Sequence, residues 1–241
     1  MPRTFAPIAL SVGATIELPS ASAHHVREAL RLRVGDTLTV FNGHGGEFRC
    51  RLTAITRQAV AVMIAEFAAI ERESPLTITL AQGISRGEKM DYTLQKAVEL
   101  GVTRLVPLTS ARSQIKLDAE RAARRMEHWR GIITHACEQC GRNRVPELLA
   151  PMTVAEFVAI DTASTRLTLA PGSAMTLVSL AKPDLNASLV VGPEGGLSAS
   201  ELAVLEAHQY QGVRLGPRVL RTETAALVAL ATLQAIAGDL R

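Results

Sequence analysis

The chain has 241 residues, of which 47% are hydrophobic and 20% charged, an ordinary balance for a globular protein of one or two domains. Its net charge of +3 does not by itself support nucleic-acid binding, and its 3% aromatic content argues against a single-strand binder that stacks bases on aromatic side chains. No segment reaches the roughly 18 apolar residues of a membrane span, and the first ten residues lack a long apolar signal core, so we expect a cytoplasmic protein.

The first part of the chain predicts a small β-barrel over residues 1–73. A helix is expected over 20–33, with Ser20 or Ser22 as its cap. Alternating strands follow at 37–41, 47–52 and 59–64, the first two joined by a glycine-rich reversal. Short strands joined by tight turns without long helices are typical of such a barrel. A charged link closed by Pro75 ends this part.

The second part, residues 74–241, predicts a parallel α/β sheet. Strands are expected at 76–81, 102–108, 166–169, 188–191 and 212–215, and helices at 89–100, 118–140, 198–208 and 222–237. Alternation of strands and helices places ligand loops at the carboxyl ends of the strands.

Basic residues are unevenly spaced along the chain, with arginines crowded into a few stretches, so a polyanionic partner is plausible. The alternative is that these arginines are solvated on helix faces. Cys137 and Cys140 have the spacing of a redox or metal pair, but no second pair completes a zinc site. We therefore expect reduced cysteines and no bound metal.

The strongest motif is Gly-Pro-Glu-Gly-Gly at 192–196. It follows an apolar strand and precedes a helix that Ser198 can cap, with Glu201 completing a capping box. Glycines let a ligand approach the backbone closely, although a plain strand-to-helix turn has the same pattern. The motif is neither a Walker loop nor a dinucleotide-binding fingerprint.

A second motif spans 215–225, where a strand ends in Gly-Pro and a helix opens at Thr222. The stretch 225–237 carries no charge, which predicts a helix buried on most sides. Arg221 and Glu223, in its first turn, should therefore either pair with each other or face a ligand.

Two further segments are polar beyond what their helices require. Lys89, Lys96 and Glu99 lie near one helix face, for which a solvated charged face is the simpler reading. Residues 138–142 end a helix and include Arg142.

In these four segments the chain resembles the family of 16S ribosomal RNA uridine-N3 methyltransferases, small-subunit methyltransferase E. The matching stretches are Gly-Pro-Glu-Gly-Gly at 192–196, Leu-Gly-Pro-Arg-Val-Leu-Arg-Thr-Glu-Thr-Ala at 215–225, Lys-Ala-Val-Glu-Leu-Gly-Val at 96–102 and Glu-Gln-Cys-Gly-Arg at 138–142. The resemblance implies a PUA-like, RNA-binding β-barrel followed by a SPOUT methyltransferase domain whose chain forms a deep trefoil knot. It also implies a homodimer that binds S-adenosylmethionine and methylates the decoding region of the small ribosomal subunit.

The resemblance implies three loops around the cofactor. The expected cofactor-binding residues are Leu169, Pro171, Gly192, Pro193, Glu194, Gly195, Gly196, Leu215, Gly216, Val219, Leu220, Thr224 and Ala225. The chain has Ala-Pro-Gly at 170–172, where some relatives have a histidine before the proline.

The expected catalytic residues are Arg221, Glu223 and Glu194. Uracil N3 keeps its proton near neutral pH and lies on the pairing edge, so the base must be unpaired and its developing anion stabilised. Arg221 would stabilise that charge, and Glu223 or Glu194 would orient the base or accept the proton. The expected RNA-binding residues are Arg27, Arg31, Arg33, Arg86, Lys89 and Arg142.

Two alternatives remain open at this point. One is a non-catalytic RNA-binding factor for ribosome assembly, and the other is a SPOUT methyltransferase acting on 23S or transfer RNA.

Overall fold

The computed structural model describes residues 1–113, 118–180 and 184–240, and its contacts divide the chain into two compact units. The first unit comprises Met1–Glu73 and Cys137–Val145, and the second comprises the other described residues.

The first unit is a five-stranded sheet in the order β1 (Arg3–Phe5), β3 (Thr37–Phe41), β4 (Glu47–Ile55), β5 (Val60–Ala68), β2 (Thr15–Glu17). All neighbours are antiparallel except β1 and β3. Apolar residues at alternate positions of β3, β4 and β5 enclose one core with α1 (Ser20–His24). The three predicted strands are confirmed, and the two outer strands were missed because each is three residues long.

The helix predicted over 20–33 is shorter in the structure. It runs as α1 and then as one π-helical turn, η1 (His25–Ala29), and Arg31 has a left-handed backbone with φ of 53°. The predicted cap is also wrong. The buried Ser22 hydroxyl donates to the carbonyl of Phe5 at 2.5 Å, and Pro19 stands at the cap position.

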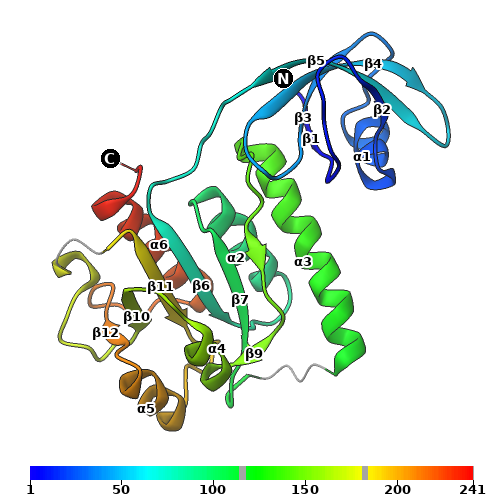
Figure 1. Ribbon diagram of the computed structural model, residues 1–241. Helices are drawn as coiled ribbons and strands as arrows, with labels where there is room; N and C mark the ends of the chain where they lie inside the picture. Colours follow the sequence, from blue (N-terminus) through cyan, green and yellow to red (C-terminus); the bar gives the residue numbers. More distant parts are fainter. Residues whose placement is uncertain (114–117, 181–183, 241) are drawn as a thin grey trace. The chain divides into compact units, whose positions relative to one another are not determined.

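The second unit is built on a seven-stranded sheet, in which all pairs are parallel. The order is β12 (Gln211–Val213), β10 (Thr165–Leu169), β11 (Asn186–Val191), β6 (Thr77–Gly83), β7 (Arg104–Thr109), β8 (Glu147–Leu148), with β9 (Met152–Thr153) also on β7. The carboxyl ends of the strands therefore meet at one edge of the sheet (Figure 1).

Helices cover this sheet (Figure 1). On one face, α4 (Val154–Ile160) and α5 (Ala199–Ala207) pack Phe157 and Leu205 against Ala81 and Val190. Elsewhere α2 (Glu88–Glu99) packs against α6 (Thr222–Ala237). The remaining helices are α3 (Ala119–Cys140) and the short η2 (Leu177–Ser179).

The predicted helices have closely matching bounds in the structure. The bounds 222–237 are confirmed for α6, and Ser198 and Glu201 form the predicted capping box of α5. Part of α6 is open, however, since Val228 is 39% exposed. The short α4, β8 and β9 were not predicted.

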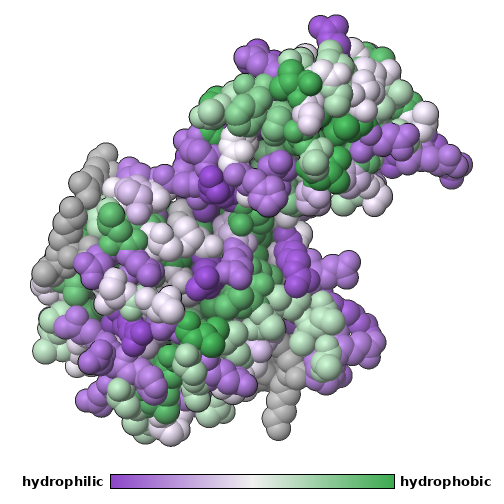
Figure 2. Space-filling model, viewed as in Figure 1, coloured by the Kyte–Doolittle hydropathy of each residue, from purple (hydrophilic) through white to green (hydrophobic). Residues whose placement is uncertain are grey.

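Within the described residues, no helix is both long and apolar enough to cross a membrane. On the face shown in Figure 2, hydrophilic residues are spread among hydrophobic ones over each unit. Cys50, Cys137 and Cys140 are free thiols, and burial raises the pKa of Cys137 to about 12. A thiol with such a pKa is protonated at neutral pH and therefore a poor nucleophile.

Candidate active site

A cavity of about 890 Å³ lies where the sheet of the second unit meets the start of α6, a volume typical of sites for small ligands. Its lining residues are Lys89, Leu169, Ala170, Pro171, Gly172, Val191, Gly192, Pro193, Glu194, Gly196, Leu197, Leu202, Val219, Leu220, Arg221, Thr222 and Ala225.

Three chain segments far apart in the sequence supply most of the cavity wall. Residues 169–172 begin at the last residue of β10, residues 191–197 begin at the last residue of β11, and residues 219–225 include the first turn of α6. The first two segments leave neighbouring parallel strands at their carboxyl ends, where open α/β sheets bind their ligands.

Glycine permits close backbone packing beside this cavity. A Cβ atom added to Gly192 would lie 3.0 Å from the carbonyl carbon of Gly196, and Gly196 has a positive φ of 69°. Side chains at these positions would therefore strain the loop. The capping box of Ser198 and Glu201 then fixes where α5 begins, which sets the end of the loop.

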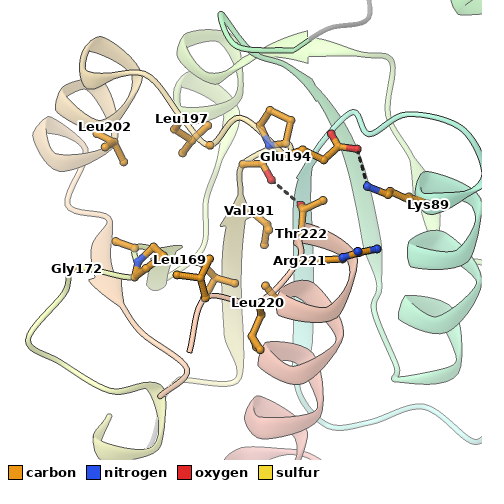
Figure 3. Close-up of a pocket in the computed structure, with 17 residues that line it drawn as sticks. Lys89, Leu169, Gly172, Val191, Glu194, Leu197, Leu202, Leu220, Arg221 and Thr222 are labelled. Atoms are coloured by element: carbon orange, nitrogen blue, oxygen red, sulfur yellow. Dashed lines mark hydrogen bonds and ion pairs between the residues drawn. The ribbon is translucent and has the colours of Figure 1, made fainter. Parts of the chain in front are cut away.

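The cavity has an apolar side and a charged side. Figure 3 shows Leu169, Leu197 and Leu202 on one side and Glu194 with Lys89 on the other, with the side chain of Arg221 pointing toward that charged side. The ammonium of Lys89 lies 3.3 Å from Oε1 of Glu194, which also accepts the backbone N–H of Arg86 at 3.2 Å.

These contacts decide the charge of Glu194. Burial alone would raise the pKa of its carboxyl, but hydrogen bonds from backbone N–H groups and from Lys89 outweigh that effect, so its pKa is lowered. The carboxylate therefore stays ionised at neutral pH and has little tendency to take up a proton.

Most of the cofactor-binding residues expected from the sequence line the cavity: Leu169, Pro171, Gly192, Pro193, Glu194, Gly196, Val219, Leu220 and Ala225. Gly195, Leu215, Gly216 and Thr224 are not among the lining residues.

The expected catalytic residues are placed differently from one another. Arg221 and Glu194 line the cavity, whereas Glu223 does not. In the described part of the chain no ion pair joins Arg221 to Glu223, and the buried Oε2 of Glu223 has no hydrogen-bond partner there.

The expected RNA-binding residues lie on both units. In the first unit Arg31 and Arg33 are exposed, and the half-buried Arg27 donates to the carbonyls of Thr56 and Arg57. In the second unit Arg86 is exposed and Lys89 faces the cavity.

Arg142 is placed differently, because it is only 3% exposed. Its guanidinium Nε donates to Oε1 of Glu73 at 3.0 Å, and Nη2 lies 2.5 Å from Oε2. Such a paired, buried arginine ties residues 137–145 to the first unit. Arg142 is therefore not part of the RNA-binding surface that we propose.

Sequence reasoning did not assign Thr222 or the cavity-facing position of Lys89. Thr222 donates its hydroxyl proton to the Gly192 carbonyl at 2.6 Å, and Lys89 meets Glu194 from a position 105 residues earlier. Neither contact leaves a signal in local spacing, although both residues belong to the segments singled out above.

The comparisons with known proteins agree with this geometry. The model of an RNA methyltransferase domain matches residues 72–234, and that of an RNA methyltransferase PUA domain matches residues 18–64. Ribosomal RNA small subunit methyltransferase E of Buchnera aphidicola subsp. Schizaphis graminum is 32% identical, covering 100% of this chain and 98% of its own length. The Bacillus subtilis protein of that name is 31% identical, covering 91% and 89%.

A solved structure extends the similarity to three dimensions. The structure of a ribosomal RNA small subunit methyltransferase E from Neisseria gonorrhoeae, bound to S-adenosyl methionine, has a TM-score of 0.96 and 40% sequence identity. The match covers 100% of both chains, so both units have counterparts there.

Proposed function

The chain belongs to the RNA methyltransferase family, and we propose that it transfers the methyl group of S-adenosylmethionine to N3 of a uridine in 16S ribosomal RNA of the small subunit. Membership confirms the expected fold class, an α/β SPOUT methyltransferase domain preceded by a PUA-like barrel. The observation that carries the proposal is the cavity at the carboxyl ends of β10 and β11, apolar on one side and charged on the other.

The apolar side fits the cofactor. Leu169, Val191 and Leu220 offer apolar contacts to the faces of an adenine ring, and the glycines of 192–196 let its polar edge approach backbone groups. S-adenosylmethionine supplies an activated methyl group on a sulfonium, so the transfer needs no metal. The relatives' match supports the same cofactor.

The charged side fits the methyl acceptor. As N3 of uracil loses its proton, negative charge spreads to the neighbouring oxygens, and the guanidinium of Arg221 is placed at the cavity to stabilise it. Glu194 is better suited to orient cations than to act as a base, because its pKa is lowered. We propose Glu223 to accept the proton or orient the base: its buried Oε2 has no partner among the described residues, but because Glu223 lies outside the cavity lining, its side chain would have to turn toward the base.

RNA would be held by basic side chains of both units. We assign phosphate contacts to Arg27, Arg31 and Arg33 in the barrel and to Arg86 and Lys89 in the methyltransferase domain. Binding through phosphates should weaken steeply with salt, so affinity measured from 50 to 200 mM salt tests this assignment. An affinity that stayed flat would contradict it.

The domains then divide the work, with residues 1–73 binding RNA and residues 74–241 transferring the methyl group. We further propose that the protein acts in the cytoplasm as a homodimer on the decoding region of the assembled small subunit, as the family resemblance implies.

The decisive experiment incubates the protein with methyl-labelled S-adenosylmethionine and small ribosomal subunits that lack their modifications. After digestion of the RNA, the label is expected in N3-methyluridine. Label in another nucleoside would overturn the assigned position, and label only with 23S or transfer RNA would overturn the assigned substrate. Binding of both partners without any label would favour the assembly-factor alternative.

A further inference from the structure

The carboxyl end of β6 carries a buried amide that the reaction described above does not use. Gln82 is 1% exposed, and its Nε2 donates to the carbonyl of Gly83 at 3.1 Å and to the hydroxyl of Thr222 at 2.9 Å. Since both partners accept, the amide nitrogen must face them.

Thr222 passes this interaction on to the glycine-rich loop. Its hydroxyl has one proton, which it donates to the carbonyl of Gly192 at 2.6 Å (Figure 3). The hydroxyl oxygen accepts in turn from Nε2 of Gln82. Gln82, Thr222 and Gly192 thus form one directed chain of hydrogen bonds, here called the Gln82 relay. Hydrogen bonds in such a chain polarise one another in a poorly solvated environment.

Close packing of the backbone makes the relay short. A Cβ atom added to Gly83 would lie 2.3 Å from the nitrogen of Pro193 and 2.5 Å from its Cδ, so the end of β6 touches the loop directly. Gln82 is also paired in register with Val191, the residue before Gly192. The pairing of β6 with β11 therefore sets the distance between Gln82 and the glycine-rich loop that the relay spans.

The relay connects two segments that carry charged residues of the cavity, the start of α6 and the glycine-rich loop. Thr222 follows Leu220 and Arg221 and is the first residue of α6, while Gly192 precedes Pro193 and Glu194. Fixing Thr222 against Gly192 consequently fixes Arg221 relative to the loop that carries Glu194.

We propose that Gln82 and Thr222 are positioning residues for methyl transfer. This proposal rests on the proposed function. Through the relay they hold Arg221 and the glycine-rich loop at the separation that cofactor and uracil require. A displacement of about 1 Å at such a site can lower the rate about 100-fold.

The test compares Thr222→Val with Thr222→Ser. Valine keeps the shape of threonine but neither accepts nor donates, whereas serine keeps the hydroxyl. We expect Thr222→Val to lower kcat about 10- to 100-fold with KM for the subunit unchanged, and Thr222→Ser to stay within about threefold of wild type. Gln82→Met, which removes the donor to Thr222 together with the one to the Gly83 carbonyl, should lower kcat about tenfold with the same unchanged KM.

A second readout does not depend on activity. The Kd for S-adenosylmethionine, measured by calorimetry on the full chain, should rise several-fold in Thr222→Val and stay near wild type in Thr222→Ser. Thermal unfolding of each variant separates a positioning effect from loss of fold.

The outcomes distinguish the two proposals. An unlabelled wild type in the methylation assay counts against the proposed function, and the Kd comparison then decides the role of the relay alone. A labelled wild type with equal kcat for the valine and serine variants overturns the relay proposal. So does a loss of kcat that merely follows a loss of thermal stability.

Discussion

The two ends of the sheet in the second unit differ in whether their buried polar groups have hydrogen-bond partners. At the amino ends of the strands, a buried carboxylate is surrounded by donors. At the carboxyl ends, where the cavity lies, buried acceptor atoms remain without partners among the described residues. Buried polar groups in proteins are normally satisfied, so the two ends differ in how completely the chain pairs its own polar groups, although neither unpaired acceptor belongs to a residue that lines the cavity.

The amino end is built around Asp161, which precedes β10. Its Oδ2 accepts from the hydroxyl of Ser188 at 2.6 Å and from the hydroxyl of Tyr210. Nε of Arg166 lies 3.6 Å from the same oxygen. Its Oδ1 accepts the backbone N–H of Ala163 at 3.1 Å. This cluster binds three neighbouring strands together at their start.

The carboxyl end has the opposite character. Oε1 of Gln82 and Oε2 of Glu223 are buried without hydrogen-bond partners within the described residues, and Arg221 is exposed at the cavity. The comparison separates a stabilising end from a functional end, and each can be tested by substitution.

The largest expected effect is on stability, at the amino end. Asp161→Ala removes the acceptor shared by Ser188, Tyr210 and Arg166, and should lower the free energy of unfolding by about 3–5 kcal/mol. Urea unfolding measures it, with the exposed Asp184→Ala as the matched control. An Asp161 variant as stable as the control would show that this cluster does not stabilise the sheet.

Next comes activity, at the carboxyl end. Arg221→Ala should lower kcat about 100-fold or more while leaving the Kd for S-adenosylmethionine and the thermal stability nearly unchanged. Arg104→Ala, which removes a half-buried cation paired with Glu147 at the start of β7, is the matched control and should keep full activity. Equal, small effects of Arg221→Ala on kcat and Kd would remove Arg221 from the reaction.

A single methyl group tests the tight packing beside the cavity. Gly83→Ala would bring a Cβ within 2.3 Å of Pro193, and overpacking of this kind should weaken S-adenosylmethionine binding about tenfold or more. Gly131→Ala, whose added Cβ meets no atom within 4 Å, should bind the cofactor as wild type does. Calorimetry compares the Kd for S-adenosylmethionine of the two variants. Equal values would mean that the glycine-rich loop can shift to accommodate the added methyl group without loss of binding.

The smallest effect concerns Glu201, a satisfied carboxylate at the carboxyl end. Burial would raise the pKa of its carboxyl, but hydrogen bonds from the backbone of Ser198 and Ala111 and from two serine hydroxyls outweigh it, so its pKa is lowered. Glu201→Gln should cost about 1 kcal/mol of unfolding free energy at pH 7.

The sign of the pH dependence follows from the lowered pKa. The stabilisation is fully present above the pKa of Glu201 in the unfolded chain and is lost as pH falls through its lower folded value. Unfolding curves of wild type and Glu201→Gln should therefore converge in acid, whereas the exposed Glu206→Gln should match wild type throughout. A difference that grew in acid would contradict the assignment.

Local signals in the sequence were enough for much of this fold. The capping box at Ser198 and the uncharged run after Thr224 place α5 and α6, because caps and periodicity act over a few residues. Two-residue strands such as β8 and β9 carry no such pattern, and their pairing with β7 is set by distant residues.

The site was predictable in part for the same reason. The glycine-rich loop and Arg221 stand out in the sequence, but Lys89 and Gln82 reach the site from more than 100 residues away. Arg142 shows the converse, since a buried arginine paired with Glu73 looks in sequence like any surface arginine.

The anchoring of α6 has a consequence for how the protein is made. Its first residue bonds to Gln82. Gln234, near its other end, donates to the carbonyl of Leu100 and accepts from Ser74, at sequence separations of 134 and 160. Contacts so distant along the chain carry a large loop-closure entropy and are therefore slow to form. A growing polypeptide therefore has no complete cofactor site until this helix has been synthesised and docked. The appearance of S-adenosylmethionine binding can consequently be used to time the final folding step.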